Sequence, residues 1–346
     1  MRTRLSIPRA PVLLATRRSL VRILAAAGAA LKFPAAGFGT VFQVDRLLSR
    51  RSTEETEVSE RRYRADAVIM LLSIPVYSRA GVGSGAIALR CRRGGDCRVV
   101  SLEFAAGSFP GRAKGLNRLG FIREVVGERD GAAPEAAYFG FMTSSPEENL
   151  DEARRALKTE AEDQIPYTAI DGYAGGSVSR ARIARFRFPA RYNWHDWPHL
   201  VNEVRESFET RQPVTRETPL PASGTEAVTF LHAVLRAFSS AGERFETAYV
   251  YNGRQFRLRT EKSPDGRAGR QFAERGLCGA GCRVVRLHGL ITEESNRRET
   301  QFKIWIDESS GSRLPVRIEF QPRSFLRLAF EFEPVRESTA VRKEDL

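Results

Sequence analysis

Short apolar runs separated by glycine-bearing turns recur along most of the chain, and they constrain its fold more than any other feature. The clearest turn is Asn252-Gly253, which stands between the runs FETAYVY and RQFRLRTEK. A type I′ turn needs a positive φ at both central residues, and Asn-Gly meets that need best. The last run, RLAFEFE, alternates apolar and charged residues, as a strand with one buried and one wet face does. The pattern predicts antiparallel hairpins.

Roughly twelve strands are expected after Arg61 on these signals. The strand-like runs lie at 63–78, 83–91, 97–105, 121–129, 135–142, 167–174, 177–188, 245–251, 254–262, 282–292, 300–308, 313–321 and 325–333. Three helices are expected among them, at 145–158 behind the cap Ser145, at 198–209 and at 225–240. The apolar stripe of the third helix consists of Val228, Leu231, Leu235 and Phe238. The chain is therefore predicted to be mainly β with a few helices, its curved antiparallel sheet or incomplete β-barrel packed on helices.

The domain organisation follows from composition. Residues 1–44 are expected to be an export leader or an N-terminal anchor, and the charged segment 45–60 a linker. Residues 61–335 are expected to form a single β-rich domain with a helical insert around 145–210, followed by a polar tail at 336–346. The 346 residues suffice for a sizeable core, and the 42% hydrophobic content is that of a globular protein.

The leader carries much of the chain's basic character. Residues 1–44 contain seven basic residues and no Asp or Glu, so 48 basic residues face 42 acidic ones in the remainder, a net charge of +6 instead of +13. The arginines of the remainder are scattered, whereas a nucleic-acid binder clusters them on one face. No nucleic-acid partner is therefore expected.

Arg17 and Arg18 resemble a twin-arginine export signal, with Ser19, two apolar residues and Arg22 behind them. The Ala-rich stretch that follows is too short and too interrupted for a comfortable membrane span. Periplasmic or other extracytoplasmic localisation is expected, with the membrane contacted only through this leader. An uncleaved inner-membrane anchor, an amphipathic helix, a mitochondrial-type presequence and an over-extended start codon stay open.

All four cysteines belong to two similar segments, which share the residues Cys-Arg-Val-Val behind a glycine turn. Two local disulfides are the preferred interpretation, Cys91–Cys97 and Cys278–Cys282, and they agree with export because disulfides persist in oxidising compartments. The spacings differ from the C-x2-C of zinc knuckles and redox dithiols. A single four-thiolate metal site and free thiols stay open, but no metal and no cofactor is expected.

No catalytic motif is apparent elsewhere. His195 and His199 have the spacing of two zinc ligands on a helix, but Asp196 reads as the cap of a helix that starts at Trp197, with Trp194 and Trp197 as buried anchors. The glycines at 81–85 lie between strands, so a flexible turn is expected there instead of a phosphate loop. Carboxylates are plentiful, but local sequence singles out none of them.

Parts of the chain resemble the bacterial envelope family known as domain of unknown function 3108. The resemblance rests on the opening strands, on the helix EAVTFLHAVLRAF, and above all on the closing segment with Asp307, Leu314-Pro315, Ile318 and Glu319. It covers about half of the chain and leaves residues 106–220 without a counterpart. The resemblance implies a periplasmic, β-rich protein and carries over no catalytic residues.

A non-catalytic envelope protein is the function that these observations favour, one that binds an apolar ligand such as a lipid, or an envelope protein partner. The alternative is an envelope hydrolase or carbohydrate-modifying enzyme that gathers carboxylates from separate strands. A further alternative is a purely structural scaffold. A deep apolar cavity without converging charges favours the first, a pocket with two facing carboxylates favours the second, and a filled core without a pocket favours the third.

Overall fold

The computed structural model describes residues 42–49, 54–71, 74–94, 97–113, 117–143, 164–189, 196–220 and 227–334. These residues belong to one compact unit, Val41–Leu346. The predicted leader with Arg17 and Arg18, the helix at 145–158 and the tail at 336–346 lie outside the described residues.

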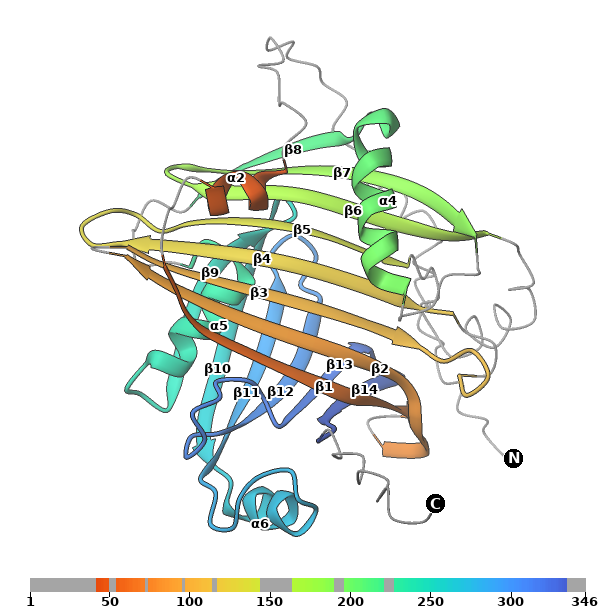
Figure 1. The fold of residues 1–346 in the computed structure, drawn as a ribbon, viewed down its shortest axis with the longest axis vertical. Helices are drawn as coiled ribbons and strands as arrows, with labels where there is room; N and C mark the ends of the chain where they lie inside the picture. The colour runs from red at the N-terminus through yellow and green to blue at the C-terminus, as the bar shows by residue number, and fades with distance from the viewer. Residues whose placement is uncertain are drawn as a thin grey trace, which may run out of the picture. The chain divides into compact units, whose positions relative to one another are not determined.

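Fourteen antiparallel strands form a single sheet, so the prediction of a mainly β protein is confirmed (Figure 1). The first eight strands are β1 (Glu54–Leu71), β2 (Ile74–Gly94), β3 (Cys97–Ser108), β4 (Leu119–Arg129), β5 (Glu135–Thr143), β6 (Gln164–Gly175), β7 (Val178–Pro189) and β8 (Val214–Pro219). The last six are β9 (Arg244–Tyr251), β10 (Arg254–Pro264), β11 (Val284–Glu293), β12 (Glu299–Asp307), β13 (Arg317–Arg323) and β14 (Leu326–Phe332).

The strand order is that of a meander that nearly closes on itself. Strands β1 to β8 are neighbours in sequence order, as are β9 to β14, and β1 pairs with β14. The β1–β14 pairing, which runs from Tyr63 opposite Phe332 to Ile69 opposite Leu326, therefore joins the first and last strands of the sheet. The two edges are β8 and β9, which are consecutive in sequence, and no ladder joins them among the described strands.

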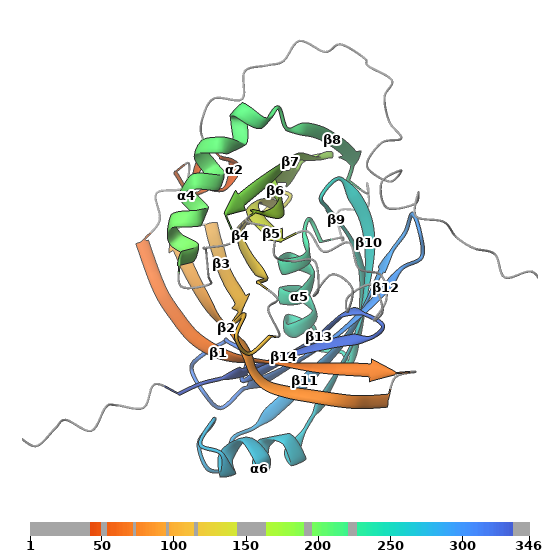
Figure 2. The ribbon, with the colours of Figure 1, turned by 90° about the vertical axis from the view of Figure 1, so that its right-hand side faces the viewer.

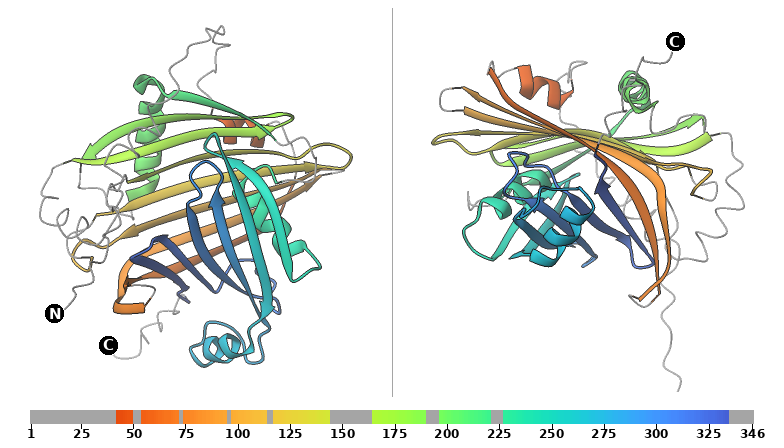
Figure 3. Two further views of the ribbon diagram at one scale, coloured as in Figure 1. Left: turned by 180° about the vertical axis from the view of Figure 1, so that it is seen from behind. Right: turned by 60° about the horizontal axis from the view of Figure 1, so that its bottom comes forward.

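Four α-helices of the described residues flank the sheet. They are α2 (Gln43–Ser49), α4 (Trp197–Phe208), α5 (Phe230–Ser239) and α6 (Gly266–Glu274), with the short 3-10 helix η2 (Glu209–Arg211) after α4. Helices α2 and α4 cover one face of β3–β7, and α5 lies on the opposite, concave side (Figures 2 and 3). None of the helices in the described ranges is both long and apolar enough to cross a membrane.

The alternation of side chains along β4 explains why the sheet has an apolar core on each of its faces. Phe121 and Val125 belong to the core beneath α2 and α4, whereas Val126 packs against Leu231 of α5. Successive side chains of a strand point to opposite faces, so one strand supplies both cores. The apolar stripe predicted for 225–240 faces the sheet as expected, with Val228 and Leu231 buried, although the helix itself begins only at Phe230.

Two boundary predictions near the N-terminus are wrong. The predicted linker 45–60 contains most of α2, whose Val44 and Leu47 are buried, and the first residues of β1. Tertiary packing stabilises such a short helix, which would be marginal alone. The run 63–78 is not one strand, because β1 ends at Leu71 and β2 begins at Ile74.

The glycine-rich segment 81–85 is part of β2 and not a flexible turn, so this prediction is also wrong. Gly81 has a φ of 61° where the β1–β2 register shifts between Ala65 and Ala67. The Gly81 N–H donates to the Asp66 carboxylate at 2.7 Å. Glycine supplies the left-handed conformation that this bulge needs.

The hairpin predictions hold over most of the sheet. Asn252 and Gly253 both have positive φ, 55° and 64°, as a type I′ turn requires. Residues 121–129 and 135–142 fall in the β4–β5 pair, and 167–174 and 177–188 fall in the β6–β7 pair. Strand β8 and helix α6 were not predicted, since a six-residue polar edge strand and a nine-residue helix with Phe272 as its one large apolar residue offer too few apolar residues to reveal a period.

Strand β14 corrects the prediction of one wet face for RLAFEFE. Ala329, Phe330 and Glu331 are all buried. Glu331 is covered by Arg64, Arg275 and Arg317, and its carboxylate accepts from Arg317 Nη1 at 2.9 Å and from Arg275 Nη1 at 2.8 Å. A buried carboxylate is tolerated when cations and hydrogen bonds compensate its lost hydration.

The Leu314-Pro315 pair lies between β12 and β13 and fixes β1 to this end of the sheet. Leu314 is buried, Arg61 Nη1 donates to its carbonyl at 2.8 Å, and Tyr63 Oη donates to the Pro315 carbonyl at 2.8 Å. The closing segment therefore has a structural role in pairing the two ends of the meander.

Candidate functional site

Glu124 on β4 is the most strongly perturbed acid of the inner face, and it lies at the N-terminus of α5. Its Oε1 accepts from the Leu231 N–H at 3.0 Å and from the Thr229 hydroxyl. Burial raises the pKa of this carboxyl to about 7, and the hydrogen bonds from Thr229 and Leu231 lower it only in part. Desolvation therefore outweighs the charge-stabilising effect of the two donors.

His232 forms a second polar link between α5 and β4. Its Nδ1 accepts from the Val228 N–H at 3.2 Å, and its Nε2 lies 3.4 Å from Glu128 Oε1. The hydrogen bond from His232 lowers the pKa of Glu128, with Arg98 and Arg236 adding to the shift. Glu124 and Glu128 are four residues apart on one strand, about 13 Å at the usual rise, so they do not share a proton.

Three tyrosines complete the polar end of the inner face where it meets the β9–β10 turn. Tyr138 stacks on Tyr251 with ring centroids 4.5 Å apart, and its hydroxyl accepts from the Asn252 N–H at 2.9 Å. Burial raises the pKa of Tyr138, Tyr249 and Tyr251. A Cβ at Gly172 would meet the Tyr138 ring at 2.1 Å, so glycine is required for this ring to cross β6. These contacts hold the β9–β10 turn against β5.

The rest of the inner face is apolar and aromatic. Buried Tyr249, Leu258, Leu287 and Phe302 pack with Ala233, Val234 and Ala237 of α5. Five further apolar side chains pack against this cluster and keep part of their surface exposed: Phe245, Phe256, Ile291, Ile304 and Phe320. We call these five the inner apolar rim. One comes from each of the neighbouring strands β9 to β13, so the pairing of these strands brings the five together.

The buried carboxylates of the described residues all have hydrogen-bond donors. Besides Glu124 and Glu331, they are Asp171, Glu293 and Asp307. Asp171 accepts from Arg182 Nη2 at 2.6 Å and from the Gln43 N–H at 3.1 Å. Glu293 accepts from Arg254 at 2.8 Å, and Asp307 accepts from the Ser309 N–H at 2.9 Å. Each of these contacts joins a strand to another strand, a helix or a turn.

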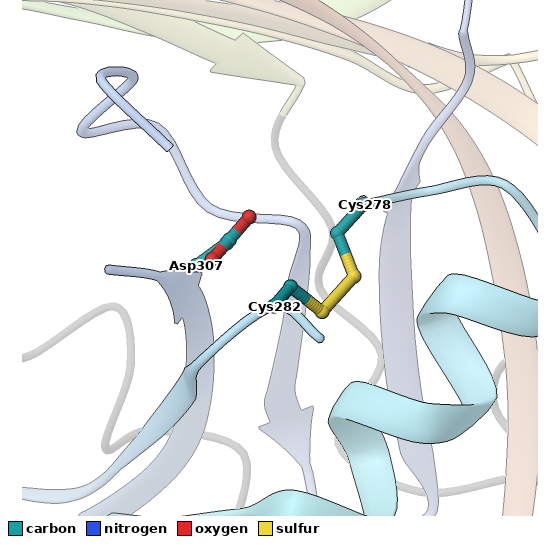
Figure 4. A group of neighbouring side chains, drawn as sticks. All are labelled: Cys278, Cys282 and Asp307. Atoms are coloured by element: carbon teal, nitrogen blue, oxygen red, sulfur yellow. A yellow bond between two sulfur atoms is a disulfide. The ribbon is translucent and has the colours of Figure 1, made fainter. Parts of the chain in front are cut away.

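Cys278 and Cys282 form a disulfide, with Cα atoms 6.2 Å apart (Figure 4). The bridge closes the loop between α6 and β11 and packs beside Phe272, Val284 and Trp305. Asp307 lies close enough to both sulfurs for the three to form a metal-binding group. Since the sulfurs are bonded to each other, they are not the thiolates that a metal site needs.

Cys91 and Cys97 lie on the paired strands β2 and β3. Cys91 is buried and faces Val100, whereas Cys97 faces Gly94 in the register. The two Cα positions are thus three residues apart along the ladder, about 10 Å, and a disulfide needs less than about 7 Å. This register does not favour a Cys91–Cys97 bridge, which stays a prediction because the Cys97 side chain lies outside the described residues.

Of the two histidines with the spacing of zinc ligands, only His199 lies in the described part of the chain. His195 and Trp194 lie outside the described residues, and His199 is exposed on α4. Helix α4 begins at Trp197 with Asp196 at its N-cap position, as predicted, although the Asp196 side chain makes no capping hydrogen bond to the helix. Trp197 stacks on Phe121 at 5.2 Å and serves as the expected anchor.

Sequence reasoning missed Glu124, although a signal for it exists. An acidic residue in the middle of the apolar run FIREVVGER is unusual for a buried strand, and Thr229 before FLHAVLRAF has the form of a helix cap. Neither signal reveals the other, because the two residues are 105 positions apart.

Comparisons with known proteins give little to carry over. No family model and no curated protein matches the sequence. Among solved structures, the crystal structure of a beta-barrel-like protein of domain of unknown function DUF1849 from Brucella abortus is similar, with a TM-score of 0.40 and 7% sequence identity. The match covers 82% of this chain and 98% of that chain. The β-rich, barrel-like architecture expected from the resemblance is present in the structure, but the similar structure just described belongs to domain of unknown function DUF1849 and not to domain of unknown function 3108.

Proposed function

We propose that this protein is an exported, non-catalytic envelope protein that binds an apolar ligand, a lipid or lipid-like molecule, on the inner face of its sheet beside α5. The inner apolar rim is the observation that carries the proposal. Its five side chains are partly exposed although they adjoin the buried cluster around Leu258 and Phe302. Apolar surface that stays accessible on a concave face is typical of a site for an apolar molecule.

The arrangement of the carboxylates supports a non-catalytic role. A glycosidase-type site needs two carboxyl groups that face each other across a substrate. Here Glu124 is bound to the N-terminus of α5, Glu128 to His232, and Asp171 to Arg182. Each of these groups has a positional partner within the fold, which suits a role in holding the sheet and its helices together.

Export and localisation are part of the proposal. Arg17 and Arg18 in the leader motivate it, and the Cys278–Cys282 disulfide is compatible with an oxidising compartment. A relationship to domain of unknown function 3108 and an envelope protein partner belong to the same proposal. A scaffold without a ligand is the competing structural interpretation, and the ligand experiment below separates the two.

The test is to purify the protein from its native host without detergent, extract it with organic solvent and identify bound molecules by mass spectrometry. A stoichiometric apolar molecule is expected. Phe320→Ser in the inner apolar rim should reduce its occupancy, whereas Val214→Ser, which changes an exposed apolar residue on β8, should not. Ile291→Trp adds bulk without removing apolar surface and should displace the ligand. Protein that carries no apolar molecule would refute the proposal and favour the scaffold.

Export is tested by intact mass spectrometry of the same native material. Loss of the leader is expected, as is a lower amount of extracytoplasmic protein when Arg17 and Arg18 are both changed to Lys. Full-length protein whose distribution does not change with these substitutions would refute the export part and leave the ligand-binding part standing.

An envelope hydrolase is the second candidate, and one observation favours it. A carboxyl group whose pKa is raised to about 7, as that of Glu124 is, suits a general acid. Hydrolysis of chromogenic glycosides or esters by the purified protein, abolished in a folded Glu124→Gln variant, would support this candidate. Equal and negligible rates for both proteins would exclude it.

A further inference from the structure

The end of the β1–β2 hairpin exposes an unusual run of apolar side chains. Ile74, Val76 and Tyr77 are 64%, 55% and 49% exposed, and Pro75 between them is exposed as well. Among the described residues, six large apolar side chains are at least 49% exposed, and three of these six lie within residues 74–77. Single exposed apolar residues are ordinary, but a contiguous group of them marks an interaction surface.

The β2 side of the hairpin end is exposed on both of its faces. Ile74 and Pro75 lie opposite Leu71 and Met70, successive residues of β1, so they point to opposite faces, and both are exposed. Among the described strands, Ile74–Arg79 pairs with β1 alone, because the β2–β3 register begins at Gly83. The end of the hairpin also lies beyond β14 (Figure 2). Although Met70 of β1 is buried, residues 74–77 of β2 are exposed in succession, and such an apolar segment fits a medium that surrounds it better than a flat protein surface.

Strand addition is not the interaction that this edge favours. Pro75 has no N–H to donate, and proline on an edge strand is a common protection against pairing with another chain. The β1–β2 register also shifts between Ile69 and Met70, opposite this part of β2. A second protein strand would therefore find an interrupted ladder.

The charges around the hairpin end are mostly positive. Residues 67–78 contain no charged side chain, and Arg79 is the first charge along β2. Across the sheet, Val68 pairs with Arg327, and Ile69 pairs with Leu326, the partner of Arg323. Two carboxylates adjoin these residues. Asp66 accepts from Arg64 Nε at 3.1 Å and from the Gly81 N–H, and Glu319 Oε2 lies 3.7 Å from Arg327 Nη1. An anionic surface would meet cations behind an apolar tip.

We propose that the β1–β2 hairpin end, residues 74–77, inserts into the interface of an anionic lipid bilayer. Ile74, Val76 and Tyr77 supply apolar area at the depth where headgroups meet acyl chains, and the arginines behind them meet the headgroup phosphates. This surface is separate from the inner apolar rim, and it adds a membrane contact that the leader does not provide. Its failure would leave the ligand proposal untouched.

The binding test uses the full-length chain and vesicles of phosphatidylcholine with phosphatidylglycerol. The double variant Ile74→Ser/Val76→Ser should partition at least about tenfold more weakly than the unchanged protein, from the apolar area it removes. The matched control is Val58→Ser/Met142→Ser, which changes two equally exposed apolar residues away from the tip, 51% and 62% exposed. Equal loss of binding in both double variants, or no loss in either, would overturn the proposal.

Fluorescence quenching at residue 77 distinguishes binding through the hairpin end from binding through the basic leader, which is also expected to attract anionic lipid. Tyr77→Trp adds a fluorophore at the tip, and brominated lipids should quench its emission beyond the quenching of the three native tryptophans. Tyr77→Trp emission that stays unquenched while the protein sediments with vesicles would show binding through the leader alone and refute insertion. Self-association that the Ile74→Ser/Val76→Ser variant abolishes, without vesicle binding, would assign the tip to a second copy of the chain instead.

Discussion

Glu124→Gln is the substitution that most directly tests the description of the inner face. The side chain is 4% exposed, and its Oε1 accepts from Leu231 and Thr229 at the start of α5. Glutamine keeps an oxygen that can accept from both donors and removes the charge. The variant therefore changes the protonation of the site and leaves its packing nearly intact.

The magnitude follows from the raised pKa. Folding raises the pKa of Glu124 from 4.5 to about 7, so the folded protein holds this proton more tightly than the unfolded chain. The resulting stability is fully present below about pH 4.5, declines as the pH rises toward 7, and is absent above it. A shift of this size corresponds to about 3 kcal/mol, at 1.36 kcal/mol per pKa unit.

Urea unfolding of both proteins between pH 4.5 and 8, with the disulfide intact, measures this effect. The free energy of unfolding of Glu124→Gln minus that of the unchanged protein should rise by about 3 kcal/mol across the range. Subtracting the two free energies of unfolding cancels the contributions of other titrating groups. One of these is Asp171, because burial also raises its pKa. Glu124→Ala serves as a control, because it leaves two buried donors without their acceptor and should destabilise at every pH. Parallel pH profiles for the unchanged protein and Glu124→Gln would refute the reasoning.

Three further predictions concern stability. Arg182→Met should cost about 3–5 kcal/mol in urea unfolding because it leaves the fully buried Asp171 carboxylate uncompensated, whereas Arg180→Met, at the exposed pair with Glu217, should cost less than about 1 kcal/mol; equal costs would contradict this account. Gly253→Ala should lower the thermal midpoint more than Gly276→Ala. Both positions have positive φ, but only at Gly253 would the new Cβ meet another atom, Arg216 Cβ at 2.6 Å, so similar losses would assign the effect to φ alone. The Cys278→Ser/Cys282→Ser variant should lose about 2 kcal/mol, and peptide mapping should find Cys278 linked to Cys282; a mapped link from either residue to Cys91 or Cys97 would contradict the structure.

Local patterns predicted those elements whose signal lies within a few residues. Asn252-Gly253 has the positive φ values that its sequence implies, and the stripe of α5 faces the sheet as its period requires. Predictions went wrong where a distant segment decides the environment. Val44 and Leu47 form a helix because β4 and β5 offer an apolar surface, and Glu331 is buried because arginines from β1, β13 and the end of α6 gather over it.

The candidate site shows the same division. The apolar residues of the rim are evident in the sequence as one face of each strand, but which apolar residues α5 covers and which stay partly exposed depends on how that helix packs on strands β9 to β13. Glu124 is visible as an acid in an apolar strand, yet its raised pKa depends on α5 excluding water from it.

The sequence by itself thus determined a mainly β protein, its principal hairpins, its interior helix and the cysteines that bridge α6 to β11, because period, turn geometry and short-range crosslinks are local properties. Only the tertiary structure decided which strands close the meander, which charges are buried and which apolar residues remain exposed. Those outcomes depend on contacts between residues more than a hundred positions apart, such as Glu124 with Thr229 and Tyr63 with Pro315, and no local pattern encodes such a pairing.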